Sequence, residues 1–279
     1  MASATLRSPL AHAGRQSLSF SNGSAKLSTL SSTSPTSPTS RVSTFSVSSD
    51  ENTPWEHFSP VTLAEGVVEH HYTLPCDGPP KILHVTSFEK KRSNHAVLCC
   101  PGCYECREGP SCLYNHLASE LPQKGYMVVQ LSYRPPADDE EEAAEDVMSC
   151  IDWLAEKNHH RRLDSLILVG WSMGSAAVIE AAYLRRHLPL ISGIVTLAAQ
   201  TSGTRNVKHL QVPILALHGL EDQVLPPDCS KTLVQRAADG VKSVRLQLLE
   251  KDTHRMESAL PHVLDFIFHH APREKGRAE

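Results

Sequence analysis

From residue 50 onward, short apolar runs alternate with longer stretches in which apolar residues recur at helical spacing. Such alternation is typical of a mostly parallel sheet covered by helices, because parallel strands need long crossover connections. Eight runs predict strands: Val67–Leu74, Lys81–Phe88, His95–Cys100, Tyr126–Tyr133, Ser165–Gly170, Ile191–Ala198, Pro213–His218 and Ser243–Glu250. Five stretches predict helices: Leu113–Lys124, Ala143–Glu156, Met173–Leu188, Pro227–Ala238 and Pro261–His270. The sequence therefore predicts an α/β fold with eight strands.

The first two predicted strands are joined by Asp77-Gly78-Pro79-Pro80, a sequence typical of a turn, which favours an antiparallel hairpin. The acidic run Asp138–Glu142 lies where the second helix is expected to begin. Negative charge is favourable at a helix N-terminus, so this run is interpreted as a solvated helix start.

A change of composition separates residues 1–49 from the rest of the chain. The segment holds 16 Ser, 6 Thr and four basic residues, and the first carboxylate of the chain is Asp50. Such a segment buries too little apolar surface to order itself, so we expect it to be disordered. Its composition resembles an organelle transit peptide, and sparse Arg favours a plastid over a mitochondrion. The alternative is a low-complexity tail on a cytoplasmic protein. Residues 50–279 are expected to form one domain.

The charge of residues 50–279 limits the class of partner. They carry 23 basic and 31 acidic residues and no basic stripe, which argues against nucleic-acid binding. The longest apolar run, near Leu188–Ala199, contains Pro189 and Gly193 and suits a buried strand rather than a membrane span. The sequence does not indicate an oligomeric state.

Ser172 stands in a G-x-S-x-G segment, Gly170-Trp171-Ser172-Met173-Gly174. A predicted strand precedes the segment directly, and a helix rich in small residues follows it. A nucleophile elbow needs this layout, because small neighbours let strand and helix backbones pass closely around a strained serine. The alternative is a buried turn serine without a chemical role.

Two further residues follow later predicted strands. Asp222 comes shortly after Pro213–His218, and His254 comes shortly after Ser243–Glu250. The carboxyl ends of parallel strands meet at one edge of a sheet, so Ser172, Asp222 and His254 are expected to converge there as nucleophile, acid and base. The alternatives are a turn-capping role for Asp222, with Glu221 as rival acid, and a surface-loop role for His254.

These motifs resemble the α/β-hydrolase superfamily over about Glu65–Ala271. Its esterase and lipase branches are similar to this chain in Tyr133-Arg134-Pro135, Glu145-Asp146 and Trp153-Leu154. The pattern His218–Pro226 is similar to that of dienelactone-hydrolase-like and peptidase-like members. The resemblance implies an eight-stranded sheet, a serine nucleophile and an acyl-enzyme intermediate. It does not imply a substrate, because one fold hosts many activities.

The expected oxyanion hole departs from the family pattern. Where the family has His-Gly after the third strand, this chain has Pro101-Gly102-Cys103-Tyr104. Backbone N–H groups bind the oxyanion, so the loss of a His side chain need not abolish the site. We expect the donors to be Met173 and Cys103, with Tyr104 as the alternative second donor. Trp171 and Tyr104 are candidates to line the substrate pocket, although Trp171 suits the core equally well. His218 is expected to order the acid loop.

Five of the eight cysteines fall within fourteen residues: Cys99, Cys100, Cys103, Cys106 and Cys112. Cys99 and Cys100 are expected to pack as small hydrophobic residues. A metal site would need a second suitable pair elsewhere, so none is predicted. A reversible disulfide among Cys103, Cys106 and Cys112 is the hypothesis kept.

Only fourteen residues separate Ala198 from the strand that begins at Pro213, which leaves no room for an inserted lid domain. An open site favours accessible esters or thioesters as small-molecule substrates. The sequence therefore predicts a lid-free serine hydrolase that needs no cofactor. The alternatives are a non-catalytic small-molecule receptor on the same fold, and a peptidase or acyltransferase.

Overall fold

The computed structural model of the chain describes residues 56–76, 82–104, 107–136, 138–156, 163–241 and 243–271. The predictions for residues 1–49, for the turn at 77–80 and for Cys106 lie outside these residues. All the described residues belong to one compact unit.

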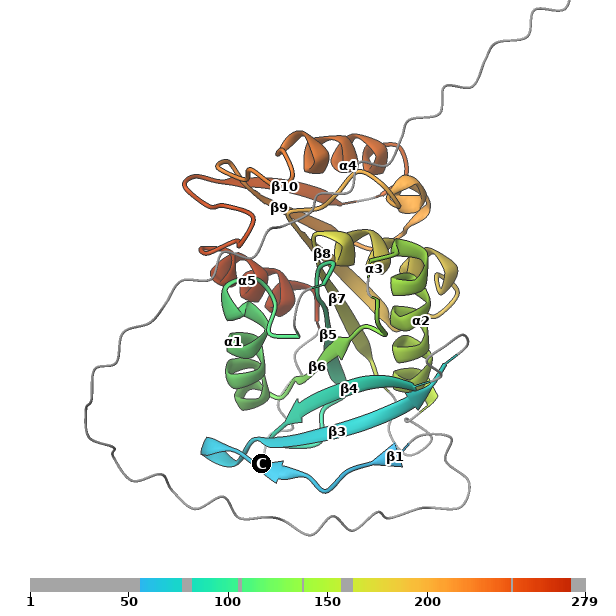
Figure 1. Cartoon of the computed structure of the whole chain (residues 1–279), viewed down its shortest axis with the longest axis vertical. Coiled ribbons are helices and arrows are strands. Elements are labelled where there is room, and N and C mark those ends of the chain that lie inside the picture. The colour runs from blue at the N-terminus through green and yellow to red at the C-terminus, as the bar shows by residue number, and fades with distance from the viewer. Residues whose placement is uncertain are drawn as a thin grey trace, which may run out of the picture. The chain divides into compact units, whose positions relative to one another are not determined.

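A single ten-stranded sheet runs through this unit (Figure 1). Its strands are β1 (Glu56–His57), β2 (Val61–Thr62), β3 (Val68–Pro75), β4 (Ile82–Glu89), β5 (His95–Cys100), β6 (Met127–Ser132), β7 (Ser165–Trp171), β8 (Ile191–Leu197), β9 (Ile214–Gly219) and β10 (Val244–Leu249). Their order across the sheet is β1-β3-β4-β6-β5-β7-β8-β9-β10, with β2 paired to β3. Strands β6, β5 and β7 to β10 pair in parallel, whereas β3 and β4 form the antiparallel hairpin that the sequence predicted.

All eight predicted strands are therefore present, and the mostly parallel α/β sheet is confirmed. The count of eight was too low by the two-residue strands β1 and β2, both antiparallel to β3 at the edge. Two residues are too few to show the alternation by which a strand is recognised in a sequence.

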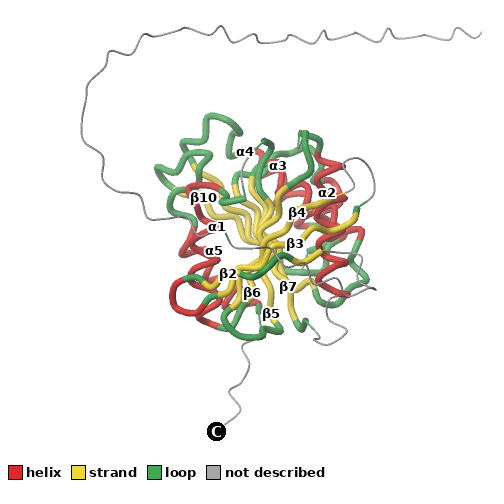
Figure 2. Tube along the Cα trace, turned by 60° about the horizontal axis from the view of Figure 1, so that its bottom comes forward, coloured by secondary structure: helices red, strands yellow, loops and turns green. Residues whose placement is uncertain are grey.

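Helices cover both faces of the sheet (Figures 1 and 2). One face carries α1 (Leu113–Glu120) and α5 (Leu260–His270); the other carries α2 (Glu140–Glu156), α3 (Met173–Leu184) and α4 (Asp228–Ala238). Alternate residues of one strand serve the two faces, because successive side chains of a strand point in opposite directions. In β7, Leu166 and Leu168 pack on the face covered by α2, α3 and α4. Ile167 and Val169 pack on the face covered by α1 and α5. Burial on both faces explains why these strands are continuously apolar.

Two helices end earlier than predicted, and a proline follows within a few residues of each end. Helix α1 gives way after Glu120 to a 3₁₀ turn, Leu121–Lys124, which contains Pro122. Helix α3 ends at Leu184 instead of Leu188, where Arg185 leaves the helical conformation with a φ of −105° and a ψ of 17°. Leu188 precedes Pro189, which disfavours the helical conformation at Leu188 as well.

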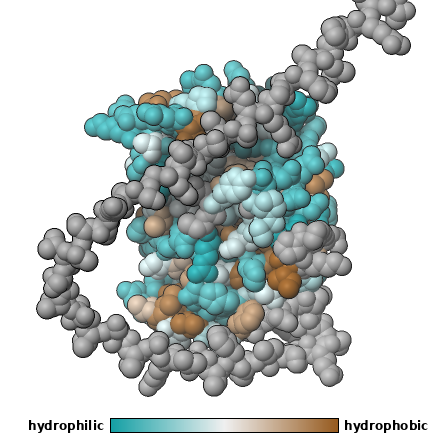
Figure 3. Space-filling model, viewed as in Figure 1, coloured by the Kyte–Doolittle hydropathy of each residue, from teal (hydrophilic) through white to brown (hydrophobic). Residues whose placement is uncertain are grey.

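No lid is inserted between β8 and β9, where the chain forms only a short 3₁₀ helix, Arg205–His209. The face in Figure 3 is mostly hydrophilic, with apolar residues in small scattered groups. Within the described part of the chain, every helix is too short or too polar to cross a bilayer.

Candidate active site

Ser172 occupies a strained turn between β7 and α3. Its φ of 54° and ψ of −120° are a conformation that residues with a side chain rarely adopt. The turn is closed on both sides by glycines. A Cβ at Gly170 would lie 2.3 Å from the carbonyl oxygen of Gly174, and a Cβ at Gly174 would lie 2.3 Å from that of Pro101. The close approach of strand, helix and the loop after β5 therefore requires glycine at both positions, as the elbow motif predicted.

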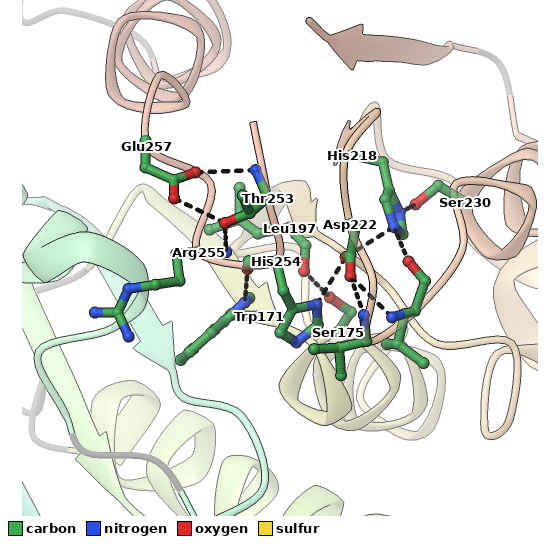
Figure 4. Close-up of polar contacts among 12 residues, drawn as sticks. Trp171, Ser175, Leu197, His218, Asp222, Ser230, Thr253, His254, Arg255 and Glu257 are labelled. Atoms are coloured by element: carbon green, nitrogen blue, oxygen red, sulfur yellow. Dashed lines mark hydrogen bonds and ion pairs between the residues drawn. The ribbon is translucent and has the colours of Figure 1, made fainter. Parts of the chain in front are cut away.

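The structure brings Asp222 and His254 together, although 32 residues separate them in the chain (Figure 4). His254 Nδ1 lies 2.7 Å from Oδ2 of Asp222. The other carboxylate oxygen, Oδ1, accepts hydrogen bonds from the backbone N–H groups of Val224 at 2.8 Å and Leu225 at 2.9 Å. The carboxylate is thus fixed by its own loop, and the bond to Nδ1 leaves Nε2 of His254 as the nitrogen that can accept a proton.

A second histidine lies behind the carboxylate. The side chain of His218, at the end of β9, is fully buried, and its Nε2 lies 3.2 Å from Oδ2 of Asp222 and 2.9 Å from the carbonyl oxygen of Leu225. On the other side of the ring, Nδ1 lies 2.7 Å from the hydroxyl of Ser230 in α4. Burial lowers the pKa of His218 below its ordinary value of 6.5. The expectation that His218 orders the acid loop agrees with these contacts.

The loop of His254 is fixed by contacts to β7 and within itself. The indole N–H of Trp171 donates to the backbone carbonyl oxygen of His254 at 2.9 Å, and the two rings lie 5.6 Å apart. Glu257 accepts hydrogen bonds from the hydroxyl and the backbone N–H of Thr253 at 2.7 and 3.1 Å. Trp171 directly precedes Ser172, so these contacts hold the histidine loop beside the nucleophile turn.

Among the described contacts, no hydrogen bond joins the Ser172 hydroxyl to the His254 ring. Catalytic hydrogen bonds are often long in unliganded enzymes and tighten when substrate binds. Ser172 is partly exposed, and the side chain of His254 is 15% exposed, whereas that of Asp222 is fully buried. The arrangement suits an accessible nucleophile and base supported by a carboxylate shielded from water.

The loop after β5 lies against the same turn. The buried hydroxyl of Tyr114 donates to the carbonyl oxygen of Cys100 at 2.8 Å, which fixes the point where this loop leaves the sheet. Cys103 is partly buried. Met173 is the first residue of α3, and the N–H of such a residue has no acceptor within its own helix. The assignment of Met173 and Cys103 as oxyanion donors, with Tyr104 as the alternative, remains a prediction.

The two aromatic residues expected at a substrate pocket have different surroundings. Trp171 is 2% exposed, so it packs in the core, which was the open alternative for this residue. Tyr104 is 72% exposed and donates its phenol hydrogen to Asp138 at 2.6 Å. This hydrogen bond raises the pKa of Tyr104. A cavity of about 660 Å³ lies between α2, α3 and the segment after β8, and Ser172, Asp222 and His254 do not line it.

Two other motif residues form a buried structural contact. The backbone N–H of Arg134 donates to Oδ2 of Asp146 at 2.9 Å, and its guanidinium Nε donates to the other carboxylate oxygen. This pair joins the segment after β6 to α2. We therefore interpret Arg134 and Asp146, which belong to the esterase-like pattern, as residues that stabilise the fold.

The cysteines near this site are reduced where the structure describes them. Cys103 and Cys112 are both free thiols, so no disulfide joins them, and a bridge to Cys106 would involve a residue outside the described part. Cys99 and Cys100 are fully buried, which raises the pKa of both thiols, and they pack as small hydrophobic residues as predicted. The described His, Cys, Asp and Glu side chains form no group of three or more that could hold a metal ion.

Comparison with known proteins decides the family. The family profile described as phospholipase/carboxylesterase matches residues 126–271, just over half of the chain. The chain belongs to the phospholipase/carboxylesterase family. The matched segment contains Ser172, Asp222 and His254, and it leaves out β5 and the loop that follows β5.

Solved structures agree with this family in fold. An alpha-beta serine hydrolase homologue from Coxiella burnetii is 18% identical, with a TM-score of 0.57, and the match covers 77% of this chain and 100% of that one. A dienelactone hydrolase from Anabaena variabilis is 18% identical, with a TM-score of 0.58 and coverage of 71% and 94%. A cold-adapted esterase from an Arctic intertidal metagenomic library is 15% identical, with a TM-score of 0.60 and coverage of 75% and 96%. Comparison with curated protein sequences gives no significant match.

This member of the phospholipase/carboxylesterase family is thus an esterase-like α/β-hydrolase, and small-molecule esters are the substrate class that the family suggests. Sequence reasoning missed the contacts of Tyr114 with Cys100 and of Ser230 with His218. Neither Tyr114 nor Ser230 stands in a motif, and only the packing of α1 and α4 against the sheet brings them to their partners.

Proposed function

We propose that this protein hydrolyses carboxylic esters or thioesters through an acyl-enzyme on Ser172, with His254 as base and Asp222 as the acid that orients it. The observation that carries the proposal is the 2.7 Å contact of His254 Nδ1 with a buried Asp222, held beside a nucleophile turn with positive φ. A carboxylate on Nδ1 fixes the tautomer in which Nε2 accepts a proton, and it stabilises the imidazolium that forms.

The reaction would proceed in two balanced halves. Nε2 of His254 takes the proton of the Ser172 hydroxyl while Oγ bonds to the acyl carbon, and the carbonyl electron pair moves onto oxygen. Collapse of this intermediate breaks the bond to the alcohol or thiol, which leaves with the proton from His254. A water molecule then gives one proton to His254 and attacks the acyl-enzyme. The carboxylic acid leaves, and the proton returns to Ser172.

The open site supports small, accessible substrates. Ser172 is partly exposed, and only a short 3₁₀ helix follows β8 where a lid could stand. Without a lid, a long acyl chain would keep most of its apolar surface in water and would gain little binding energy from its length. The open site therefore favours substrates with short acyl groups. Esters and thioesters share the acyl carbonyl on which this chemistry depends.

Labelling with a fluorophosphonate probe tests the proposal on the full chain. We expect the wild-type protein to be labelled and the Ser172→Ala variant to lose labelling. Ser119→Ala, which changes an exposed serine of α1, is the matched control and should label normally. A folded wild-type protein that is not labelled would overturn the proposal, and labelling without turnover of short esters or thioesters would favour the receptor alternative.

We also propose that residues 1–49 direct the protein to an organelle, with a plastid as the first expectation. Their Ser-rich, acid-free and weakly basic composition supports this proposal. Fusion of residues 1–49 to a fluorescent protein in plant cells tests it: import and cleavage support a transit peptide, and diffuse cytoplasmic fluorescence contradicts it.

A further inference from the structure

The acid of the proposed site has an unequal environment at its two oxygens. Oδ1 of Asp222 is held by two backbone N–H groups of its own loop. Oδ2 faces two imidazole rings, His254 at 2.7 Å and His218 at 3.2 Å. The orientation of the carboxylate is therefore set at Oδ1, and the contact with His218 is an additional feature of the oxygen that supports the base.

The contacts of His218 define which of its nitrogens carries hydrogen. Nε2 faces only acceptors, the carbonyl oxygen of Leu225 and the carboxylate of Asp222. A lone pair in this position would be repelled by both oxygens, so Nε2 must carry the hydrogen. Nδ1 faces the Ser230 hydroxyl, which can either donate or accept a hydrogen bond. A neutral ring with hydrogen on Nε2, and with Ser230 donating to Nδ1, satisfies every contact.

Burial keeps this ring in the neutral form, since it lowers the pKa of His218. A protonated His218 would neutralise Asp222 and remove the charge that His254 needs during the reaction. A neutral donor instead shares the charge on Oδ2 without cancelling it. Oδ2 of Asp222 thus faces the N–H of a neutral ring in addition to the ring of His254.

We propose that His218 is a positioning residue that weakens the interaction between the acid and the base. As a neutral imidazole it donates its Nε2–H toward Oδ2 of Asp222, and it thereby limits how strongly that oxygen stabilises a proton on His254. This inference rests on the proposed function of Asp222 and His254. A base that is protonated less readily is ready to accept the Ser172 proton at lower pH.

The groups that act on the His254 ring come from several elements. Asp222 follows β9, His218 is the penultimate residue of β9, and the Trp171 ring at the end of β7 is uncharged. The charged residues on the histidine's own loop, all of them exposed except Asp252, are Glu250, Lys251, Asp252, Arg255 and Glu257. Asp252 accepts the N–H of Ser258 and Glu257 is bonded to Thr253, so His218 is the neighbour that shares Oδ2 with the base.

Substitution of His218 tests the inference through a pH profile. His218→Leu removes the donor, and His218→Asn also removes it because its shorter amide reaches only the position of Nδ1. Either change should move the acid limb of the kcat/KM profile to higher pH by roughly half a unit, because Oδ2 then interacts with His254 alone. His218→Gln, whose amide reaches the position of Nε2, should restore the wild-type limb.

Ser230→Ala is the matched control. It removes the hydroxyl that contacts Nδ1 and should lower the melting temperature, but it leaves the Nε2 donor in place, so the acid limb should not move. A general loosening of the acid loop would instead lower activity equally at all pH values in every variant. That result would overturn the inference, and so would movement of the limb to lower pH.

A second readout separates this inference from the proposed function. NMR titration of labelled histidine, with His254 assigned from the signal lost in His254→Asn, follows the ring without turnover. A higher titration midpoint for His254 in His218→Leu and His218→Asn supports the inference even in a protein that does not hydrolyse esters. Fluorophosphonate labelling together with an unchanged midpoint would leave the proposed function standing and refute the role of His218.

Discussion

The two sides of the candidate site are built in different ways. The acid–base side, residues 218–225 and 250–257, is fixed by hydrogen bonds among buried or half-buried side chains, centred on Asp222. On the expected oxyanion side, the described residues of the loop after β5, 101–104 and 107–112, are distinguished by their backbone conformation. Tyr104, Gly109, Ser111 and Cys112 all have positive φ there.

This difference follows the chemistry that each side would perform. Proton transfer needs ionisable side chains with defined partners, whereas an oxyanion is bound by backbone N–H groups whose direction depends on φ and ψ. Asp222 and His254 lie within the segment that matches the family, as does the expected donor Met173, whereas the loop after β5 lies outside it. One side can therefore follow the family while the other departs from it in sequence.

The largest effect is expected from a change to the acid. Asp222→Asn keeps the shape of the side chain but removes its charge and favours the wrong tautomer of His254, so kcat should fall roughly 10³- to 10⁴-fold. Ester hydrolysis and thermal unfolding are measured together. A fall of less than tenfold at an unchanged melting temperature would show that Asp222 does not act as the acid, and Glu221→Gln would then test its rival.

The next largest effect is expected on the other side, from Tyr114→Phe. The variant leaves the buried carbonyl oxygen of Cys100 without its donor, which should lower the free energy of unfolding by about 1–3 kcal/mol. Because that carbonyl begins the loop after β5, kcat should also fall. Urea denaturation and steady-state kinetics check both expectations, and a loss of stability with full kcat would show that the loop is positioned by other contacts.

A smaller effect is expected from pH on stability. The pKa of His218 is lower in the folded state, so below its ordinary value of 6.5 the unfolded chain binds the proton more tightly. The stability that the neutral ring contributes is therefore complete above pH 6.5 and is lost as the pH falls toward the lowered value. Urea denaturation at several pH values should show a steeper loss on acidification for wild type than for His218→Gln. Equal slopes would contradict a buried neutral ring.

The smallest effect on the fold is expected from thiol modification, which probes the loop after β5 directly. Cys112 is exposed, whereas Cys99, Cys100 and Cys150 are buried. Under native conditions a maleimide should therefore react with Cys112 and leave those three intact. Mass spectrometry of peptides identifies the site, and activity before and after reductant tests whether a disulfide in this loop regulates the enzyme. Unchanged activity would refute that hypothesis.

Much of the fold was predictable because its strands carry strong local signals. The strand at His95–Cys100 was predicted at its observed bounds, since burial on both faces makes it continuously apolar. The end of α3 was misplaced by four residues, because apolar spacing continued to Leu188 although the helix had ended at Leu184. Helix ends depend on caps and on nearby prolines, which periodicity does not report.

The sequence by itself determined the order of strands and helices and the places of Ser172, Asp222 and His254 after three strands. It could do so because apolar periodicity and the elbow glycines are local properties of the chain. Only the tertiary structure decided that His218 and His254 both face Oδ2 of Asp222. It also decided that Ser230 contacts Nδ1 of His218, and that Trp171 fixes the loop of His254. Those contacts join residues far apart in the chain, and their distances follow from how the helices and loops pack on the sheet.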